Sequence, residues 1–112
     1  MKVKKWYGAR TLYKLSGYTS NSSSKSLYEE RIIVLMASSF DDAIMEAEKE
    51  ANIYANTTSG VIYLEYVSVF ELYESKIKNK VEVFSLMRES ALTPEKYISN
   101  FFDTGDERTK MN

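Results

Sequence analysis

The sequence contains no histidine and no cysteine among its 112 residues. The absence of cysteine excludes disulfide bonds and thiolate chemistry. The absence of histidine excludes Ser-His and Cys-His nucleophile pairs, and zinc sites built from His and Cys. Carboxylates, lysine and tyrosine remain as acid–base groups. We therefore predict no catalytic residue, no cofactor and no metal site, and favour a protein that is not an enzyme, although the sequence does not exclude one.

An excess of one charge sign and a long apolar run are also missing. Lys and Arg number 15, and Asp and Glu number 16, so the formal net charge is −1. No global field attracts nucleic acid or an anionic membrane. No segment approaches the roughly 20 apolar residues of a membrane span, and the basic N-terminus lacks the apolar core of a signal peptide. We expect a cytoplasmic protein without a membrane partner, and nucleic acid is not an expected partner.

Aromatic residues, in contrast, are abundant: nine Tyr, five Phe and one Trp. Tyr combines a large apolar area with a polar tip, so it suits half-buried positions and protein interfaces. This surplus is the most informative feature of the composition.

The hydrophobic pattern predicts a single domain, residues 1–112, with the element order β-β-α-β-β-α. Strands are predicted at residues 5–16, 27–38, 61–74 and 81–88. The simplest packing is an α+β fold in which a four-stranded, largely antiparallel sheet carries two helices on one face. The run from Ile32 to Met36 is apolar at every position, so we expect both sheet faces to be covered there.

The first predicted helix begins after Ser39, a good N-cap, and ends at the polar stretch from Asn56 to Gly60. Its apolar stripe contains several small alanines, which would let the helix lie close to a sheet. The second helix begins after Thr93, with the only proline of the chain at its first position.

Two helices on one face would leave the other face of the sheet uncovered. Alternate strand residues face opposite ways, so roughly half of the aromatic residues on the strands must point away from the helices. An exposed aromatic patch usually marks an interface. The alternative is that the sheet curls, or the first hairpin folds over, and buries these side chains. The candidate interface residues are Trp6, Tyr7, Tyr13, Tyr63, Tyr66, Tyr73 and Phe84.

The triplet Asp103-Thr104-Gly105 is the one that aspartic proteases carry at their catalytic loop. That loop lies between strands, and its Asp shares a proton with a second Asp. Here the triplet follows the apolar turn from Tyr97 to Phe102, and a polar segment follows it. We interpret Gly105 as the left-handed residue that ends the second helix.

A small bacterial family resembles this chain in the segments WYGA, YEERI, SFDDAIMEAEKEA, VFELYE and EVFSLMRESALTPEKYISNFFDTGDE. It is the domain of unknown function number 4288. The resemblance runs from Trp6 to about Arg108 and is most specific in its C-terminal part. It implies a bacterial, intracellular, stand-alone small protein, and it supplies no activity, cofactor or catalytic residue to transfer.

Three functions stay open at this point. The first is a non-enzymatic interaction module, acting as a homodimer or on a protein partner through an aromatic sheet face; an immunity or antitoxin-like protein is one version. The second is a small-ligand binder or enzyme that uses Arg, Tyr and Glu in a cleft beside the sheet, with Arg10, Arg31 or Arg88 holding an anion. The third, nucleic-acid binding, would need the three lysines of residues 76–80 to join the basic N-terminus.

Overall fold

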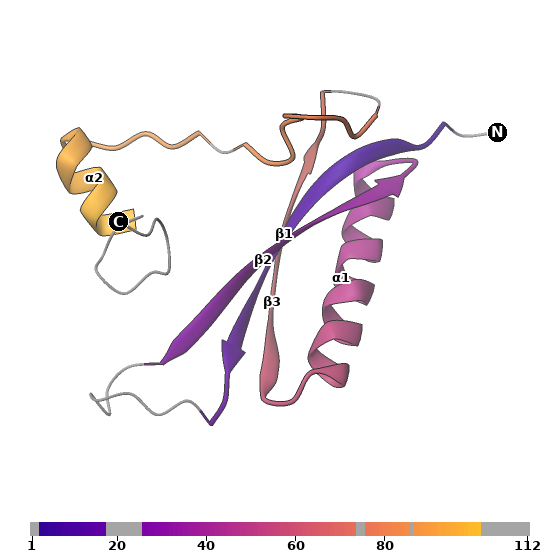
Figure 1. Cartoon of the computed structure of the whole chain (residues 1–112), viewed down its shortest axis with the longest axis horizontal. Coiled ribbons are helices and arrows are strands. Elements are labelled where there is room, and N and C mark those ends of the chain that lie inside the picture. The colour runs from indigo at the N-terminus through magenta and orange to yellow at the C-terminus, as the bar shows by residue number, and fades with distance from the viewer. Residues whose placement is uncertain (1–2, 18–25, 74–75, 86, 102–112) are drawn as a thin grey trace.

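The computed structural model describes residues 3–17, 26–73, 76–85 and 87–101. In chain order the elements are β1 (Lys5–Leu15), β2 (Leu27–Ala37), α1 (Phe40–Thr57), β3 (Val61–Glu71) and α2 (Pro94–Phe101). The fold is α+β, with a three-stranded antiparallel sheet and two helices (Figure 1).

β1 is the central strand, and the sheet order is β2-β1-β3. The ladder between β1 and β2 runs without interruption from Lys5 opposite Ala37 to Leu15 opposite Leu27. Because successive side chains of a strand point to opposite faces, the buried, odd-numbered Tyr7 and Tyr13 mark the face that α1 covers.

α1 begins where the sequence predicts. The hydroxyl of Ser39 accepts a hydrogen bond from the Asp42 N–H at 3.1 Å, which satisfies one of the free donors of the first turn. Ala43, Ala47 and Ala51 are the buried residues of the helix. With no large side chain on this stripe, α1 can lie close to the sheet.

The core lies between α1 and the sheet in two clusters. One joins Tyr7 to Ala37 and Ala43, and the other joins Tyr13 to Ala51 and Tyr63. The rings meet edge to face: Tyr7 and Phe40 have centroids 5.2 Å apart, and Tyr13 and Tyr54 have centroids 5.0 Å apart. This arrangement suits the quadrupoles of aromatic rings. Large rings of the central strand therefore fill the space that the helix alanines leave.

The predicted fourth strand, residues 81–88, is wrong: its described residues, 81–85 and 87–88, belong to no strand. Residues 81–85 instead cross the sheet on the side away from α1. The Val83 carbonyl lies where a Cβ on Gly8 would lie, and the Phe84 ring lies 6.2 Å from that of Phe70. The apolar residues that suggest a strand cover part of a sheet face instead of extending its edge.

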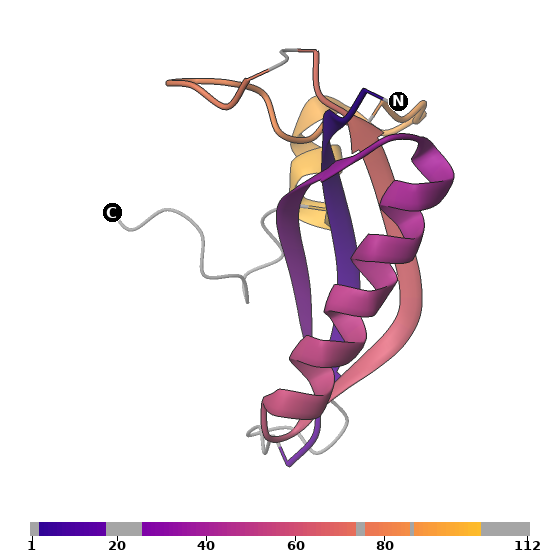
Figure 2. The same cartoon turned by 90° about the vertical axis from the view of Figure 1, so that its right-hand side faces the viewer.

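The placement of both helices on one face is also wrong. α2 begins at Pro94, as predicted, and the Thr93 hydroxyl accepts a hydrogen bond from the Lys96 N–H at 3.3 Å. It lies on the opposite side of the sheet from α1 (Figure 2) and, within the described chain, packs on no other element. Because residues 81–85 cross the sheet, the chain leaves it on the side away from α1.

Two further sequence predictions concern the triplet near the C-terminus and membrane spans. The triplet Asp103-Thr104-Gly105 lies outside the described residues, so its interpretation as a helix end stays a prediction. No helix of the described residues is both long enough and apolar enough to cross a membrane.

The close approach at Gly8 gives a prediction for the crossing segment. A Cβ at this position would overlap the Val83 backbone, so we expect Gly8→Ala to displace residues 81–85 and to lower the free energy of unfolding by about 1–3 kcal/mol. Urea unfolding would measure the stability, and tryptic cleavage at Lys80 and Arg88 would report the displacement.

The matched control is Gly17→Ala. Gly17 has φ +78°, and no atom lies within 4 Å of the point that a Cβ would occupy. This change should therefore strain the backbone by about 1 kcal/mol without releasing the crossing segment. Equal cleavage of Gly8→Ala and the unchanged protein would contradict the contact between Gly8 and Val83.

Candidate interaction surface

The side of the sheet away from α1, called the open face below, carries a row of apolar side chains on β2. Tyr28, Ile32, Val34 and Met36 share this face with Glu30. Their exposed fractions are 59%, 48%, 40% and 44%. We call these four apolar residues the β2 patch. They lie at alternate positions of one regular strand, apart from the interruption at Glu30, so they form one stripe rather than scattered exposures.

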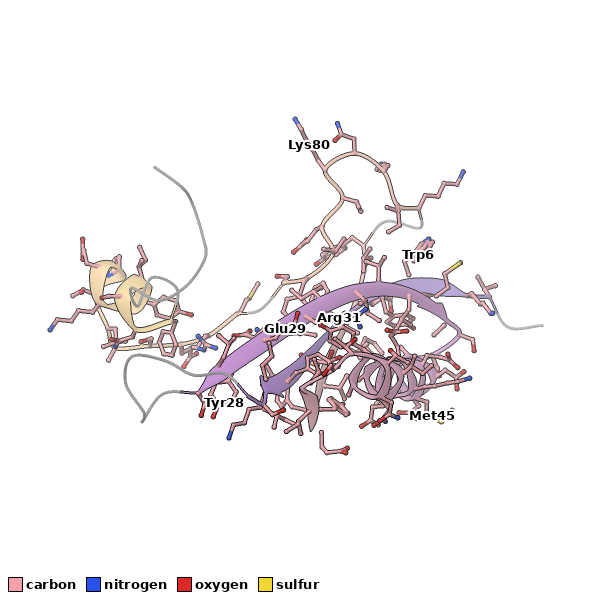
Figure 3. All side chains as sticks on the ribbon, turned by 60° about the horizontal axis from the view of Figure 1, so that its bottom comes forward. Trp6, Tyr28, Glu29, Arg31, Met45 and Lys80 are labelled. Carbon is pink, nitrogen blue, oxygen red and sulfur yellow. The ribbon has the colours of Figure 1, made fainter. Side chains whose placement is uncertain are left out.

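The β2 patch continues onto the central strand at one end. Trp6 of β1 is half-buried and lies opposite Met36 in the ladder. Figure 3 shows Trp6 on the other side of the sheet from Met45 of α1. The end of the open face therefore combines an indole ring and a thioether, two side chains that are common in protein interfaces.

Arg10 marks the boundary between the β2 patch and the covered part of the open face. Its guanidinium group lies 5.1 Å from the centroid of the Phe84 ring and donates to the Glu30 carboxylate at 3.5 Å. Together with the contacts of Val83 at Gly8 and Phe84 at Phe70, this shows that residues 81–85 cover parts of β1 and β3. The β2 patch remains exposed.

The opposite face of β2 carries a polar network under α1. The Tyr54 hydroxyl donates to the Glu29 carboxylate at 2.7 Å, and Arg31 donates to Glu50 at 3.0 Å while lying 4.1 Å from the centre of the Tyr54 ring. The bond to Glu29 raises the pKa of Tyr54, with burial adding to the effect. These groups bind one another, so the network fastens the last turns of α1 to the edge strand.

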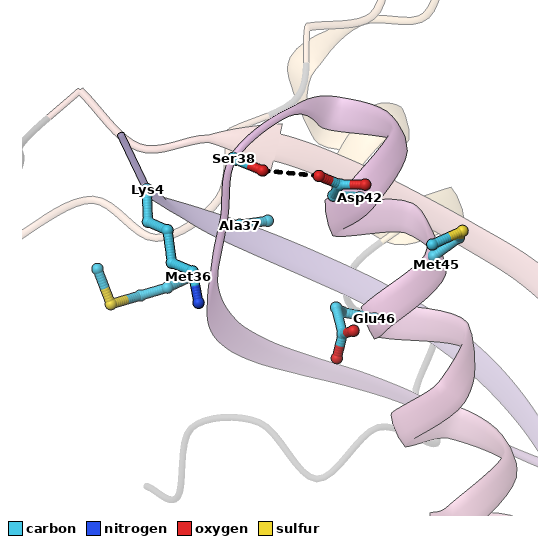
Figure 4. Close-up of a pocket in the computed structure, with 7 residues that line it drawn as sticks. All are labelled: Lys4, Met36, Ala37, Ser38, Asp42, Met45 and Glu46. Carbon is cyan, nitrogen blue, oxygen red and sulfur yellow. Dashed lines mark hydrogen bonds between the residues drawn. The ribbon is translucent and has the colours of Figure 1, made fainter. Parts of the chain in front are cut away.

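Two shallow hollows lie between α1 and β2. One, of about 370 Å³, is lined by Arg31, Ile33, Leu35, Glu46 and Glu50, among others. The second, of about 280 Å³, lies near the start of α1, where the Ser38 hydroxyl donates to the Asp42 carboxylate at 2.7 Å (Figure 4). Since β2 is the outer strand, these hollows run beside the free edge of the sheet.

The structure divides the seven predicted interface residues between the two faces. Tyr7, Tyr13 and Tyr63 are buried in the core under α1, so they are not available to a partner. Trp6 and Phe84 lie on the open face, where Phe84 covers Phe70. Tyr66 and Tyr73 are exposed, and Tyr73 lies beyond the end of β3. Three of the seven residues therefore lie under α1, and two, Trp6 and Phe84, lie on the open face.

The β2 patch itself was missing from the predicted interface. The expectation that both faces of residues 32–36 are covered is wrong, because Ile32, Val34 and Met36 are exposed. A continuous apolar run typically belongs to a strand that is buried on both faces. Here α1 covers one face of β2, and no described element covers Ile32, Val34 and Met36 on the other face, so the same run marks an unpartnered surface.

The three arginines proposed for anion binding do not converge. Arg10 is on the open face and Arg31 is on the helix side of β2. Arg88 donates to the Tyr97 hydroxyl at 3.1 Å and lies 4.4 Å from the centre of the Phe101 ring. Among the described residues no group of three or more acidic side chains could hold a metal ion.

The fold and this surface define a small α+β protein with one sheet face covered by a helix and the other partly open. The model of the family "Domain of unknown function (DUF4288)" matches residues 6–85, and the chain belongs to this family. That match confirms the resemblance to the family over residues 6–85, and the part of the resemblance between there and about Arg108 stays a prediction. Its range includes β1, β2, α1, β3 and the crossing residues, and it ends before α2. The comparisons with curated proteins and with solved structures found no match.

Tyr63 in the core gives a prediction for alkaline pH. Burial raises its pKa to about 12, and the carboxylates of Glu48 and Glu65 add to the shift. The folded state therefore holds this proton more tightly than the unfolded state, whose tyrosines titrate near pH 10. The resulting stabilisation is complete below about pH 10 and is lost as the pH rises towards about 12.

We expect Tyr63→Phe to remove this part of the pH dependence, which is at most about 2–3 kcal/mol. Urea unfolding at pH 9 and pH 11.5 would measure it. Tyr66→Phe is the control, because this side chain lies on the same strand and is 45% exposed. If Tyr63→Phe lost as much stability between the two pH values as the unchanged protein, the assignment to Tyr63 would be wrong.

Proposed function

We propose that this chain is a non-enzymatic protein-interaction module that acts through the open face of its sheet, as a homodimer or on another protein. The observation that carries the proposal is the β2 patch, four exposed apolar side chains on one face of one regular strand. The cytoplasm is the place proposed for this activity, and an immunity or antitoxin-like role is one form that it can take.

An exposed apolar stripe is costly to leave in water. At roughly 25 cal/mol per Å² of apolar area, covering a few hundred Å² contributes several kcal/mol before the costs of association. Contiguous exposed patches of this kind mark interaction sites more often than isolated exposed residues do. Residues 81–85 contact Gly8 and Phe70, and the four side chains of the β2 patch remain 40–59% exposed, which leaves them available to a partner.

The polar groups of the sheet support an interaction role over catalysis. On the helix side, Tyr54 is bonded to Glu29 and Arg31 to Glu50, and the Thr11 and Tyr13 hydroxyls are bonded to each other at 2.6 Å. A catalytic or ligand site needs polar groups that converge on a free space. These three pairs are directed at one another, as in a structural network. In the described part of the chain, the buried sheet atoms that lack a hydrogen-bond partner, Arg10 Nε and the Tyr63 hydroxyl, lie on opposite faces of the sheet.

A small-ligand site is the second candidate. The hollow of about 370 Å³ beside Arg31 places an arginine and the carboxylates of Glu46 and Glu50 next to the apolar side chains of Ile33 and Leu35. We propose this hollow as the position of the cleft in the alternative function, a ligand site beside the sheet. Its arginine is already paired with Glu50, so an anionic ligand would have to displace that carboxylate.

The test compares Ile32→Glu with Ile53→Glu. Both isoleucines are 48% exposed, but Ile32 belongs to the β2 patch and Ile53 to α1. We expect the unchanged protein and Ile53→Glu to be dimers at micromolar concentration, and Ile32→Glu to be a folded monomer. Light scattering after size exclusion measures the mass, and circular dichroism verifies folding.

If the unchanged protein is a monomer, a pull-down with the three proteins tests the version with another partner. A partner retained by the unchanged protein and by Ile53→Glu, and lost by Ile32→Glu, would support it. Equal behaviour of the three proteins in both assays would contradict the proposed function.

A further inference from the structure

The two outer edges of the sheet differ in regularity. β3 shifts register against β1 between Thr11 and Tyr13, and its Glu65 has φ 62°. Such a bulge interrupts the row of backbone groups that another strand could bind. β2 has eleven residues in one continuous register and contains no proline, glycine or lysine. It therefore lacks the proline, lysine and bulge that often protect an edge strand, and its charges are confined to Glu29, Glu30 and Arg31.

Two backbone bonds show which groups of β2 point to its free edge. The Trp6 carbonyl accepts from the Leu72 N–H, and the Ser16 N–H donates to the Gly60 carbonyl. Even-numbered residues of β1 thus direct their backbone groups towards β3, and odd-numbered residues direct theirs towards β2. In the β1–β2 register, odd-numbered residues of β1 lie opposite odd-numbered residues of β2. The backbone groups of Glu30, Ile32, Val34 and Met36 consequently point outward.

We propose that β2 pairs antiparallel with β2 of a second copy of this chain, about a two-fold axis at Ile32, to make one six-stranded sheet. The inference deepens the proposed function and rests on it, since it names the partner of the β2 patch as a second copy. The inference adds that the contact lies at the edge of the sheet. It is made by backbone groups of β2 and not only by side chains of the open face.

The length of β2 selects the register. Ile32 is the middle residue of Leu27–Ala37, so an axis there pairs all eleven residues of both strands. An axis nearer Ala37 leaves the first residues of each strand unpaired. An axis at Arg31 or Glu30 places like charges directly opposite each other, which is destabilising.

The side chains complement each other in this register. On the open face, Tyr28 of one copy lies opposite Met36 of the other, and the two Ile32 side chains meet at the axis. The two β2 patches then form one stripe, in which each Glu30 lies opposite Val34 of the other copy. On the other face, Arg31 lies opposite Ile33 of the second copy, beside the hollow lined by Glu46 and Glu50. Each Arg31 would therefore approach carboxylates of the other copy as well as its own Glu50.

The test uses single cysteines, because the chain has none of its own. Opposed residues whose backbone groups bond to each other have Cα atoms about 5.5 Å apart, which is within the range for a disulfide. We expect Ile32→Cys to form a covalent dimer on mild oxidation. Ile62→Cys is the matched control: the same residue type, also on the open face and 48% exposed like Ile32, but on β3. It should stay monomeric on a denaturing gel.

A second variant tests the backbone directly. The N–H of Val34 points to the free edge, so Val34→Pro removes no bond to β1 and should leave a folded monomer. If Val34→Pro does not fold, the comparison of Ile32→Cys with Ile62→Cys tests the proposal instead. Cross-linking by Ile32→Cys alone supports edge pairing. Equal cross-linking of both cysteine variants overturns it, and so does a folded Val34→Pro dimer.

These outcomes separate the two proposals. The first case is that Ile32→Glu is a monomer while folded Val34→Pro is still a dimer. That dimer would be face to face, so the proposed function would stand and the edge contact would be wrong. A strictly monomeric protein at high concentration overturns the edge contact. The proposed function would then depend on the pull-down alone.

Discussion

The close packing of α1 on the central strand is the contact on which the rest of the structure depends. Tyr7 and Tyr13 of β1 fill the space that Ala43 and Ala51 leave, and this is the core that three strands and one helix can build. A helix of 18 residues covers only one face of such a sheet. The open face, the crossing segment and the exposed β2 patch are consequences of that one-sided core.

The polar groups follow the same division. Under α1, Tyr54 is paired with Glu29 and Arg31 with Glu50 within the chain, because a buried polar group without a partner is costly. The buried Tyr63 hydroxyl has no hydrogen-bond partner in the described structure. On the open face, Arg10 is held between Phe84 and Glu30. The proposed interaction role therefore rests on exposed apolar side chains and edge backbone groups of β2, which are the groups used in the recognition of strands and apolar surfaces.

Local signals in the sequence predicted the position of an element correctly where a single local interaction, such as a helix cap, determines it. Ser39 predicted the start of α1 through its cap, Pro94 predicted the first residue of α2, and the small alanines predicted the buried stripe. The errors concern contacts between distant segments. Nothing local distinguishes a strand at residues 81–85 from a segment that crosses a sheet, because both place apolar side chains against an apolar surface. The cover of both faces expected from the apolar run at Ile32 to Met36 is a second error of this kind, because the run alone does not show which distant segment would lie over Ile32 and Val34.

The run from Ile32 to Ala37 combines features that are hazardous in a solitary domain. It is apolar and uncharged at every position and lies on a regular edge strand, and such segments tend to pair with other chains. Its neighbours Glu29, Glu30 and Arg31 limit how it can pair, since an axis at Glu30 or Arg31 places like charges opposite each other. An exposed strand that is attractive along most of its length and repulsive in the wrong registers can support one defined contact instead of open-ended aggregation. In this molecule the same short sequence, residues 29–37, thus supplies both the attraction and its restriction.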